Sequence, residues 1–391
     1  MPQEMSPEIF SRIVDFRREL HSYPELSWKE EKTSEKIVAY LDRLGIECKK
    51  GVVGAGIVAD IPGESGAGIV ALRADIDALP ISEETGLDFA SKNSGVMHAC
   101  GHDGHTAIVM GAAELLLADS NRRVGVRLIF QPAEEVGEGA KAMVGAGVLD
   151  GVEMIFGGHV DRQYPVGVIV PHEGAINASA DTFGIEVVGK GAHAARPHEG
   201  VDSIVAASAI VSALQTIAAR EGDPAKARVV TVGSFHAGTA NNVIASSALL
   251  EGTVRALDPE VRRETLESVK RIAEGVARTY RAQANVDIRL GTPPVINTRE
   301  MASLAREAAR AVVGDDGIKP LATANMGGED FAFYLEKIPG AFVRYGSGYV
   351  GRENAPAHSS KFDIDEGVLA VGARYLHQVV GLAEQRLLKD A

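Results

Sequence analysis

The sequence predicts an α/β protein of two domains, in which a mixed α/β domain is interrupted by a smaller inserted domain. The chain has 391 residues, which is long for a single hydrophobic core. Strand-like apolar runs alternate with helical periodicity in its first half. Between residues 179 and 290 the order of predicted elements becomes β-α-β-β-α-β, the ferredoxin-like pattern. We therefore predict a first domain made of residues 1–178 and 291–391, and an inserted domain made of residues 179–290.

The predicted first domain begins with two helices and continues with alternating strands and helices. Apolar residues recur at helical spacing over residues 8–20 and again over residues 30–44. Short apolar runs bounded by glycine or proline then predict strands, among them VGVRLIFQP from Val124 and VEMIFGGHV from Val152. These two runs contain few polar residues, which indicates strands that are buried on both faces of a sheet flanked by helices. GHTAIVMGAAELLLA, from Gly104, predicts one of the intervening helices.

Two amphipathic helices are predicted in the inserted domain, from Asp202 and from Pro259, with four strands around them. The face that we expect the first helix to bury contains Ile204, Ala207, Val211, Leu214 and Ala218. Residues 291–391 then return to the first domain, with helices predicted near residues 299–313, 329–337 and 365–385.

Charge and cysteine content limit the classes of function. The formal net charge is -13 at pH 7, which argues against a nucleic-acid partner because phosphate backbones are repelled. Cys48 and Cys100 are too few for a disulfide framework. The N-terminal segment is polar, and no apolar run approaches the ~20 residues that span a bilayer. We therefore predict a cytoplasmic protein with neither a membrane nor a nucleic-acid partner.

The densest cluster of reactive side chains is HACGHDGH, from His98 to His105. Cys100 and His102 stand two residues apart, so both side chains can turn toward one point when the backbone is extended. Thiolate and imidazole are good ligands for borderline divalent metals. The structural alternative for this segment is a helix cap at Asp103 with histidines at the surface.

Other polar side chains lie at the ends of predicted strands or in a late loop. Glu134 and Glu135, in QPAEE, follow a buried strand directly, where open α/β sheets bind their ligands. His159 ends VEMIFGGHV, and His358 lies in a polar loop before the last helix. Each could be an ordinary loop residue when taken alone. Together they complete a set of five nitrogen, oxygen and sulfur donors, enough for two metals that share a water: Cys100, His102, Glu135, His159 and His358.

Six motifs in this order resemble the M20 family of metallopeptidases: ALRADIDALP, MHACGHDGHTA, QPAEEVGEGA, FGGHV, GKGAHAARPHEGVD and GGEDFAFY. The most similar branch contains aminoacylases, hippurate hydrolases and auxin-conjugate hydrolases, and the similarity runs from RELHSYPELS to the last helix. The resemblance implies a catalytic domain with an inserted dimerisation domain, and it implies that the five donors are the metal ligands. It also implies that Glu134 is the general base.

The resemblance assigns further roles to the inserted domain. His193, in GKGAHA, would reach the active site of the partner subunit and stabilise the oxyanion. Asn242, in TANNVI, and Arg255, in GTVRAL, would hold the carboxylate of the substrate, although a surface salt bridge is the simpler role for Arg255. Because His193 would act on a partner, we predict a homodimer or a homotetramer.

Other polar residues in the motifs receive no metal. Asp75, in RADID, is expected either to orient a ligand or to pair with Arg73, which we do not expect to bind metal. His98 and His105 are expected to support the site or the fold. In GGEDF, either backbone amides hold a carboxylate, or Glu329 and Asp330 favour the start of a helix.

The sequence therefore predicts a metal-dependent amidohydrolase that cleaves the amide bond of N-acyl-L-amino acids or of related small N-acyl or aryl-acyl conjugates. A metal-bridged water and the general base Glu134 would carry the reaction, with two divalent ions per subunit. The resemblance favours manganese or zinc, with cobalt and nickel as alternatives. A metallopeptidase for small dipeptides is the alternative function.

Two further hypotheses belong to other classes. An amide hydrolase could use Cys100 as nucleophile and His102 as its base, but their spacing suits joint metal ligation better than proton transfer. A non-catalytic binding protein could keep the same fold. The presence of Glu134 and of every expected ligand argues against it.

Overall fold

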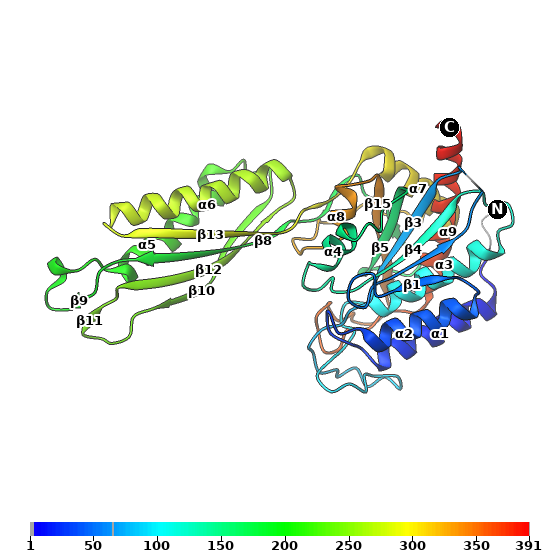
Figure 1. The fold of residues 1–391 in the computed structure, drawn as a ribbon, viewed down its shortest axis with the longest axis horizontal. Helices are drawn as coiled ribbons and strands as arrows, with labels where there is room; N and C mark the ends of the chain where they lie inside the picture. Colours follow the sequence, from blue (N-terminus) through cyan, green and yellow to red (C-terminus); the bar gives the residue numbers. More distant parts are fainter. Residues whose placement is uncertain (1–3, 65, 391) are drawn as a thin grey trace. The chain divides into compact units, whose positions relative to one another are not determined.

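The computed structural model describes residues 4–64 and 66–390 of the chain. The chain divides into two compact units (Figure 1). Unit 1 consists of Met1–Gly174, Ile296–Thr323 and Asp330–Ala391, and unit 2 consists of Ala175–Val295 and Ala324–Glu329. The assignment of unit 2 as a dimerisation domain stays a prediction.

Unit 1 is built on a seven-stranded mixed sheet with the strand order β1-β2-β4-β3-β5-β15-β6. Its centre is parallel, because β3 pairs in parallel with β4 and β5, and β5 pairs in parallel with β15. Its remaining pairings are antiparallel. The strands are β1 (Cys48–Lys50), β2 (Ile57–Ile61), β3 (Ile69–Asp75), β4 (Gly125–Gln131), β5 (Val152–Pro165), β6 (Ile169–Val170) and β15 (Gly340–Gly348).

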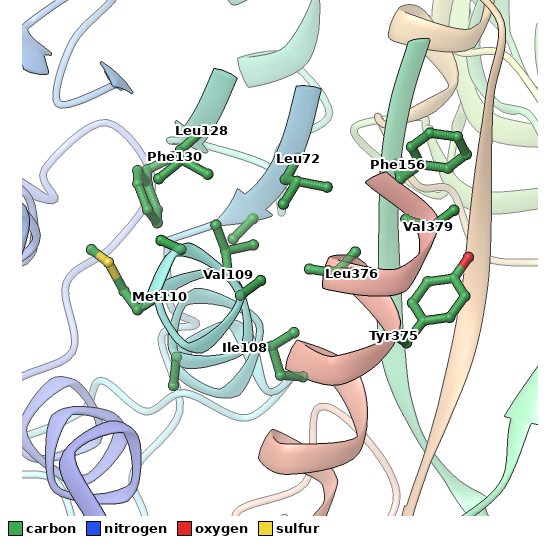
Figure 2. Packing of buried hydrophobic residues seen from close by; sticks show 14 of the residues in the cluster. Leu72, Ile108, Val109, Met110, Leu128, Phe130, Phe156, Tyr375, Leu376 and Val379 are labelled. Carbon is green, nitrogen blue, oxygen red and sulfur yellow. The ribbon is translucent and has the colours of Figure 1, made fainter. Parts of the chain in front are cut away.

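Helices supply the rest of the core of unit 1. They are α1 (Pro7–Ser22), α2 (Glu31–Arg43), α3 (His102–Ala118), α4 (Gly139–Gly145), α7 (Arg299–Val313), α8 (Ala332–Leu335) and α9 (Gly367–Asp390). Figure 2 shows Ile108 and Val109 of α3 beside Leu376 of α9, with Leu72 of β3 above them. Glycine lets α3 and α9 approach closely, since a Cβ on Gly372 would lie only 2.7 Å from Cδ1 of Ile108.

The predicted helices of unit 1 are confirmed with two changes of extent. The segment predicted as a helix near residues 329–337 forms only the short α8. The last helix begins at Gly367 and continues to Asp390, five residues beyond the predicted end.

Unit 2 contains a four-stranded antiparallel sheet in the order β10-β12-β8-β13. In chain order its main elements follow the predicted β-α-β-β-α-β pattern: β8 (Ala180–Val188), α5 (Ser203–Leu214), β10 (Arg228–Ala237), β12 (Ser247–Ala256), α6 (Pro259–Thr279) and β13 (Gln283–Thr292). The short elements of unit 2 are β9 (Ala192–His193), which pairs with β11 (Val243–Ile244), a 3-10 turn (Pro197–Glu199) and a π turn (Ile217–Glu221). β7 (Gly174–Asn177) pairs with β14 (Val295–Asn297), and both strands contain the positions at which the chain passes from one unit to the other.

The buried face of α5 differs from the predicted one. The structure buries Ala206 and Ile210 beside Ala207 and Leu214, whereas Ile204 is 40% exposed. Nearly every residue of this helix is apolar or small, so its periodicity does not define a face.

The same helix corrects the prediction about apolar runs. The segment Ser203–Glu221 is long and apolar enough to cross a membrane by length and composition, although no such run was expected. Its buried residues nevertheless pack in the core of unit 2 against Phe183 and Leu250 of the sheet. We therefore interpret α5 as a core helix, and the absence of a membrane partner stays a prediction.

Candidate metal and catalytic site

A left-handed glycine brings the first two expected ligands together. Cys100 ends the loop before α3, and His102 is the first residue of that helix. Between them Gly101 has φ 90°, and a Cβ at this position would lie 2.5 Å from Cγ2 of Val160. The expectation of an extended backbone here was wrong. A tight turn that only glycine fits directs both side chains to one side.

The carboxylates come from the loop that follows β4. Glu134 and Glu135 lie just beyond Gln131, the last residue of that strand, as the sequence predicted. Their side chains are 11% and 8% exposed, so both are almost enclosed. Oε2 of Glu134 lies 3.9 Å, and Oε1 of Glu135 3.7 Å, from Nε2 of His102.

Two histidines complete the cluster from other segments. His159 lies inside β5, which continues to Pro165, so the expectation that it ends its strand was wrong. His358 is in the loop between β15 and α9, in a left-handed conformation with φ 63°. The backbone N–H of His358 donates to the carbonyl oxygen of Ala99 at 2.8 Å, which fixes this loop beside Cys100.

All five expected ligands converge in unit 1. Sγ of Cys100 lies 3.3 Å from Nε2 of His159, and Nε2 of His358 lies 3.5 Å from Oε2 of Glu135. The donor atoms of Cys100, His102 and His159 all lie within 4.8 Å of one another, and so do those of Cys100, Glu135 and His358. Because Cys100 belongs to both groups, the arrangement could hold two cations that share its sulfur.

Two buried polar atoms of the cluster are suited to binding a cation. Nε2 of His102 and Oε1 of Glu135 are buried and have no hydrogen-bond partner among the residues that the structure describes. A buried polar atom without a partner costs about 1–3 kcal/mol, so such atoms usually serve a ligand. A set of one thiolate, three imidazoles and one carboxylate fits manganese, zinc, cobalt or nickel.

The environment of Cys100 does not suit a nucleophile. Burial and the nearby charge of Glu135 raise the pKa of the Cys100 thiol far above its ordinary value. The thiolate is the reactive form of cysteine, and only a bound cation would make it the stable form here. Sγ of Cys100 also contacts Nε2 of His159 at 3.3 Å, so His102 is not its sole imidazole neighbour.

Asp77, which was not among the predicted site residues, orients two of the expected ligands. Nδ1 of His102 donates to the carbonyl oxygen of Asp77 at 2.9 Å and faces its Oδ1 at 3.2 Å, which turns Nε2 toward the carboxylates. Oδ2 of Asp77 accepts the backbone N–H of Glu135 at 3.0 Å and the hydroxyl of Ser27 at 2.7 Å. An acidic residue two positions beyond the strand-end Asp75 was the available signal.

The pairing of Asp75 with Arg73 is confirmed, whereas its orientation of a metal ligand stays a prediction. Asp75 pairs with Nη1 of Arg73 at 2.7 Å and accepts from Nδ1 of His105 at 2.6 Å. Nε2 of His105 accepts the backbone N–H of Val160 at 3.0 Å, so this histidine is the neutral Nδ1–H tautomer. Oδ2 of Asp75 lies 3.8 Å from Nε2 of His102. His105 therefore ties β5 to the end of β3 and supports the site, as expected.

Neither predicted role of GGEDF describes Asp330. Its buried carboxylate accepts from Nη2 of Arg73 at 2.8 Å, from Nε2 of Gln131 at 2.8 Å and from the backbone N–H of Ala140 at 2.8 Å. Asp330 thus binds β3, the end of β4 and the start of α4 together, and it holds the base of the loop that carries Glu134.

A second buried network of charged side chains includes Asp103 of α3. Asp103, expected to act as a helix cap in the structural alternative, instead pairs with Arg17 and with Nδ1 of His21, both at 2.9 Å. His21 also contacts Glu83 at 3.2 Å. Burial opposes a proton on His21, but its bonds to Asp103 and Glu83 outweigh that effect and raise its pKa to about 9. His98 is buried near His21.

Unit 2 holds the other expected residues at two separate places. His193 in β9 and Asn242 lie together, since the backbone N–H of Ala194 donates to the carbonyl oxygen of Asn242 at 3.0 Å. Arg255 lies near the end of β12, where a Cβ on Gly328 would be 3.8 Å from its Nη1. About 27 Å of extended strand separates Ser247, where β12 begins, from Arg255.

Comparisons with known proteins agree with these observations. Residues 71–381 match the model of peptidase family M20/M25/M40. The N-acetyl-L-cysteine deacetylase of Bacillus subtilis is 41% identical over 368 residues, which cover 94% of this chain and 87% of the relative. An Arabidopsis thaliana protein named IAA-amino acid hydrolase ILR1-like 2 is 39% identical over 373 residues, covering 94% of this chain and 84% of the relative.

Solved structures show the same similarity. The Bacillus subtilis YxeP protein, described as a dinuclear metal-binding peptidase from the M20 family, has a TM-score of 0.85 and 40% identity. The match covers 97% of this chain and 99% of that one. The resemblance of the six motifs is thereby confirmed, and the chain belongs to peptidase family M20/M25/M40.

Proposed function

We propose that this chain is a metal-dependent amidohydrolase that cleaves the amide bond of N-acyl-L-amino acids or of related small N-acyl conjugates. The observation that carries the proposal is the convergence of five donors, two with unsatisfied buried atoms, beside the carboxylate of Glu134. The relatives named as a deacetylase of an N-acetyl amino acid and as a hydrolase of amino-acid conjugates support this substrate class.

The cation ligands in this proposal are Cys100, His102, Glu135, His159 and His358. When bound, two divalent ions, with manganese or zinc as the first candidates, supply Lewis acidity and lower the pKa of a water molecule. Asp77 holds His102 in place, and Asp75 holds His105, which bonds the backbone of Val160 next to His159.

Glu134 is the proposed general base. Its carboxylate is almost enclosed and lies 3.9 Å from Nε2 of His102, next to the donors but outside the set of five. It would accept a proton from the attacking water and pass it to the leaving nitrogen of the amide. An enclosed carboxylate can hold that proton between the two steps because bulk water is largely excluded.

His193 is proposed to stabilise the oxyanion in the active site of a partner subunit. Nδ1 of His193 accepts the backbone N–H of Ala195 at 3.0 Å, which places the proton of the neutral ring on Nε2. The side chain is exposed, so Nε2–H can donate to a developing negative charge. Asn242, beside it, and Arg255 are proposed to hold the substrate carboxylate.

The spacing within unit 2 favours an oligomer. His193 and Asn242 lie at the tip formed by β9 and β11, beyond one end of the sheet, whereas Arg255 is near the other end (Figure 1). A small substrate cannot touch both places in one copy across ~27 Å. Two copies can each supply one of these two groups of residues to the same active site, which supports a homodimer, alone or within a homotetramer.

A candidate surface for this pairing is the edge of unit 2. Within the described residues, β10 is an edge strand that pairs only with β12, and α5 packs beside it. Ile204 and Val205 of α5 are 40% and 49% exposed. An open strand edge beside exposed apolar side chains is typical of a surface that a second copy covers.

A peptidase for small dipeptides is the second candidate. It is favoured by the similar structure that is described as a dinuclear metal-binding peptidase. Both reactions would use the same ligands and the same base. The two candidates differ in the group on the carbonyl side of the cleaved bond.

Metal removal and reconstitution test the proposal. The purified protein is stripped with a chelator, reloaded separately with manganese, zinc, cobalt or nickel, and assayed for amine release. The substrates are N-acetyl, N-benzoyl and long-chain N-acyl-L-amino acids, with dipeptides as the comparison. Loss of activity on stripping and its return on reloading support the proposal, and dipeptide-only activity supports the second candidate. Full activity without metal contradicts both and revives the Cys100 nucleophile.

A further inference from the structure

The loop between β4 and α4, residues 132–138, is strained just before the proposed base. Ala133 has φ 56°, in the left-handed region that residues other than glycine seldom adopt. The loop closes on itself, because the N–H of Gly137 donates to the carbonyl of Glu134 at 2.7 Å and that of Gly139 to the carbonyl of Ala133 at 3.1 Å. Such a conformation persists only when neighbouring groups hold it.

A buried carboxylate from a distant segment holds Ala133. Oε1 of Glu30 accepts the backbone N–H of Ala133 at 2.9 Å, although the two residues are 103 positions apart. The same oxygen accepts the N–H of Trp28 at 3.0 Å, and Trp28 is itself left-handed, with φ 66°. Glu30 is completely buried. One oxygen atom therefore connects two strained backbone positions.

Helix capping does not explain this carboxylate. Glu30 occupies the N-cap position of α2 but makes no side-chain bond to that helix. Glu25 does so instead, since its Oε2 accepts from the backbone N–H of Thr33 at 2.8 Å and from its hydroxyl at 3.0 Å. The side chain of Glu30 is directed at the loop.

The backbone amides on both sides of Glu134 are held by separate carboxylates. Glu30 accepts from Ala133, and Asp77 accepts from Glu135 at 3.0 Å. Both acceptors are buried, so water does not readily replace them. The Cα of Glu134 therefore cannot shift unless one of these two bonds breaks.

We propose that Glu30 is a positioning residue that aims Glu134 for proton transfer by holding the amide of Ala133. The proposal rests on the proposed function for the role of Glu134. Burial raises the pKa of Glu30 to about 7. Its Oε2 has no hydrogen-bond partner in the described part of the chain. The oxygen of a neutral carboxyl group, or of a glutamine amide, can therefore accept the same N–H of Ala133.

Three substitutions at one position test this role. Glu30→Ala removes the acceptor and is expected to lower kcat about 10–100-fold while KM changes less than about threefold, since a small misplacement of a catalytic group has this effect. Glu30→Gln keeps the acceptor and is expected to stay within about threefold of the wild-type kcat. Glu30→Asp keeps the carboxyl group but is too short to reach the N–H of Ala133. It is expected to lower kcat as Glu30→Ala does, and it replaces that variant if Glu30→Ala fails to fold.

Glu25→Ala is the matched control. It removes a part-buried carboxylate–amide bond of the same segment without touching the loop, so it is expected to lower Tm and leave kcat unchanged. Hydrogen exchange of residues 132–138, measured on the full-length protein, is expected to accelerate in Glu30→Ala and not in Glu25→Ala.

Several results would overturn the proposal. They are unchanged exchange in Glu30→Ala, an equal loss of kcat in Glu30→Ala and Glu25→Ala, or a loss in Glu30→Gln as large as in Glu30→Ala. If the wild-type protein hydrolyses no amide at all, the proposed function fails. Hydrogen exchange then still decides whether Glu30 holds the loop.

Discussion

Replacing Asp77 with asparagine removes one of the two carboxylate oxygens that hold the proposed metal ligands His102 and Glu135. One oxygen of Asp77 faces Nδ1 of His102, and the other accepts the N–H of Glu135 and the hydroxyl of Ser27. Asparagine has one oxygen and one NH₂ group, so it can accept a hydrogen bond from only one of these two sides. Its NH₂ group then points at a hydrogen-bond donor on the other side. We expect Asp77→Asn to weaken metal affinity about 10–100-fold, the usual effect of losing such an outer partner.

The same substitution should also cost stability. Either the N–H of Glu135 loses its acceptor, or the NH₂ group of asparagine opposes Nδ1–H of His102, which keeps only the carbonyl oxygen of residue 77. A buried donor without an acceptor corresponds to about 1–3 kcal/mol of unfolding free energy. Metal affinity is measured by competition with a chelator of known affinity, and stability by urea unfolding of the stripped protein. Ser27→Ala is the control, because it removes one bond to Asp77 and leaves both ligands held. Unchanged metal affinity in Asp77→Asn would show that Asp77 does not hold the proposed ligands in place.

Three further predictions follow from particular contacts. Gly101→Ala forces a Cβ to 2.5 Å from Val160 at φ 90°, and we expect urea unfolding to show a loss of about 2–4 kcal/mol; a loss below about 0.5 kcal/mol would contradict the turn. The raised pKa of His21, about 9, means that its stabilising effect is full below pH 6.5 and is lost as the pH rises through 9. The stability difference between wild type and His21→Gln should therefore shrink by up to about 3 kcal/mol over that window, whereas a constant difference would show that His21 is neutral in the native state. Mixing inactive Glu134→Ala with inactive His193→Ala subunits should restore about one quarter of wild-type activity if His193 acts in the partner, and none if it acts in its own subunit.

Much of the fold and the composition of the site could be predicted from the sequence. Buried strands such as β4 and the helix α3 follow from long runs with a single periodicity. The five donors could be identified because cysteine and histidine clustered at strand ends have few other uses, and because the motifs resemble a known family. The structure then brings these five side chains together.

The residues that position the site could not be predicted in the same way. Glu30 and Asp77 are ordinary acidic residues in the sequence, and their roles depend on contacts with residues 103 and 58 positions away. The predicted buried face of α5 was wrong because an almost uniformly apolar helix has no periodic signal. His159 was expected at the end of a strand, but β5 continues beyond it.

The role of Glu134 as general base beside two metal ions is tested most directly by Glu134→Gln, with metal content and turnover measured on the same sample. Glutamine keeps the size of the side chain but cannot accept the proton of the attacking water. We expect about two bound ions per subunit, as in the wild type, and turnover of N-acyl-L-amino acids lowered by at least about 1000-fold. Turnover near the wild-type level, with metal bound, would contradict this role.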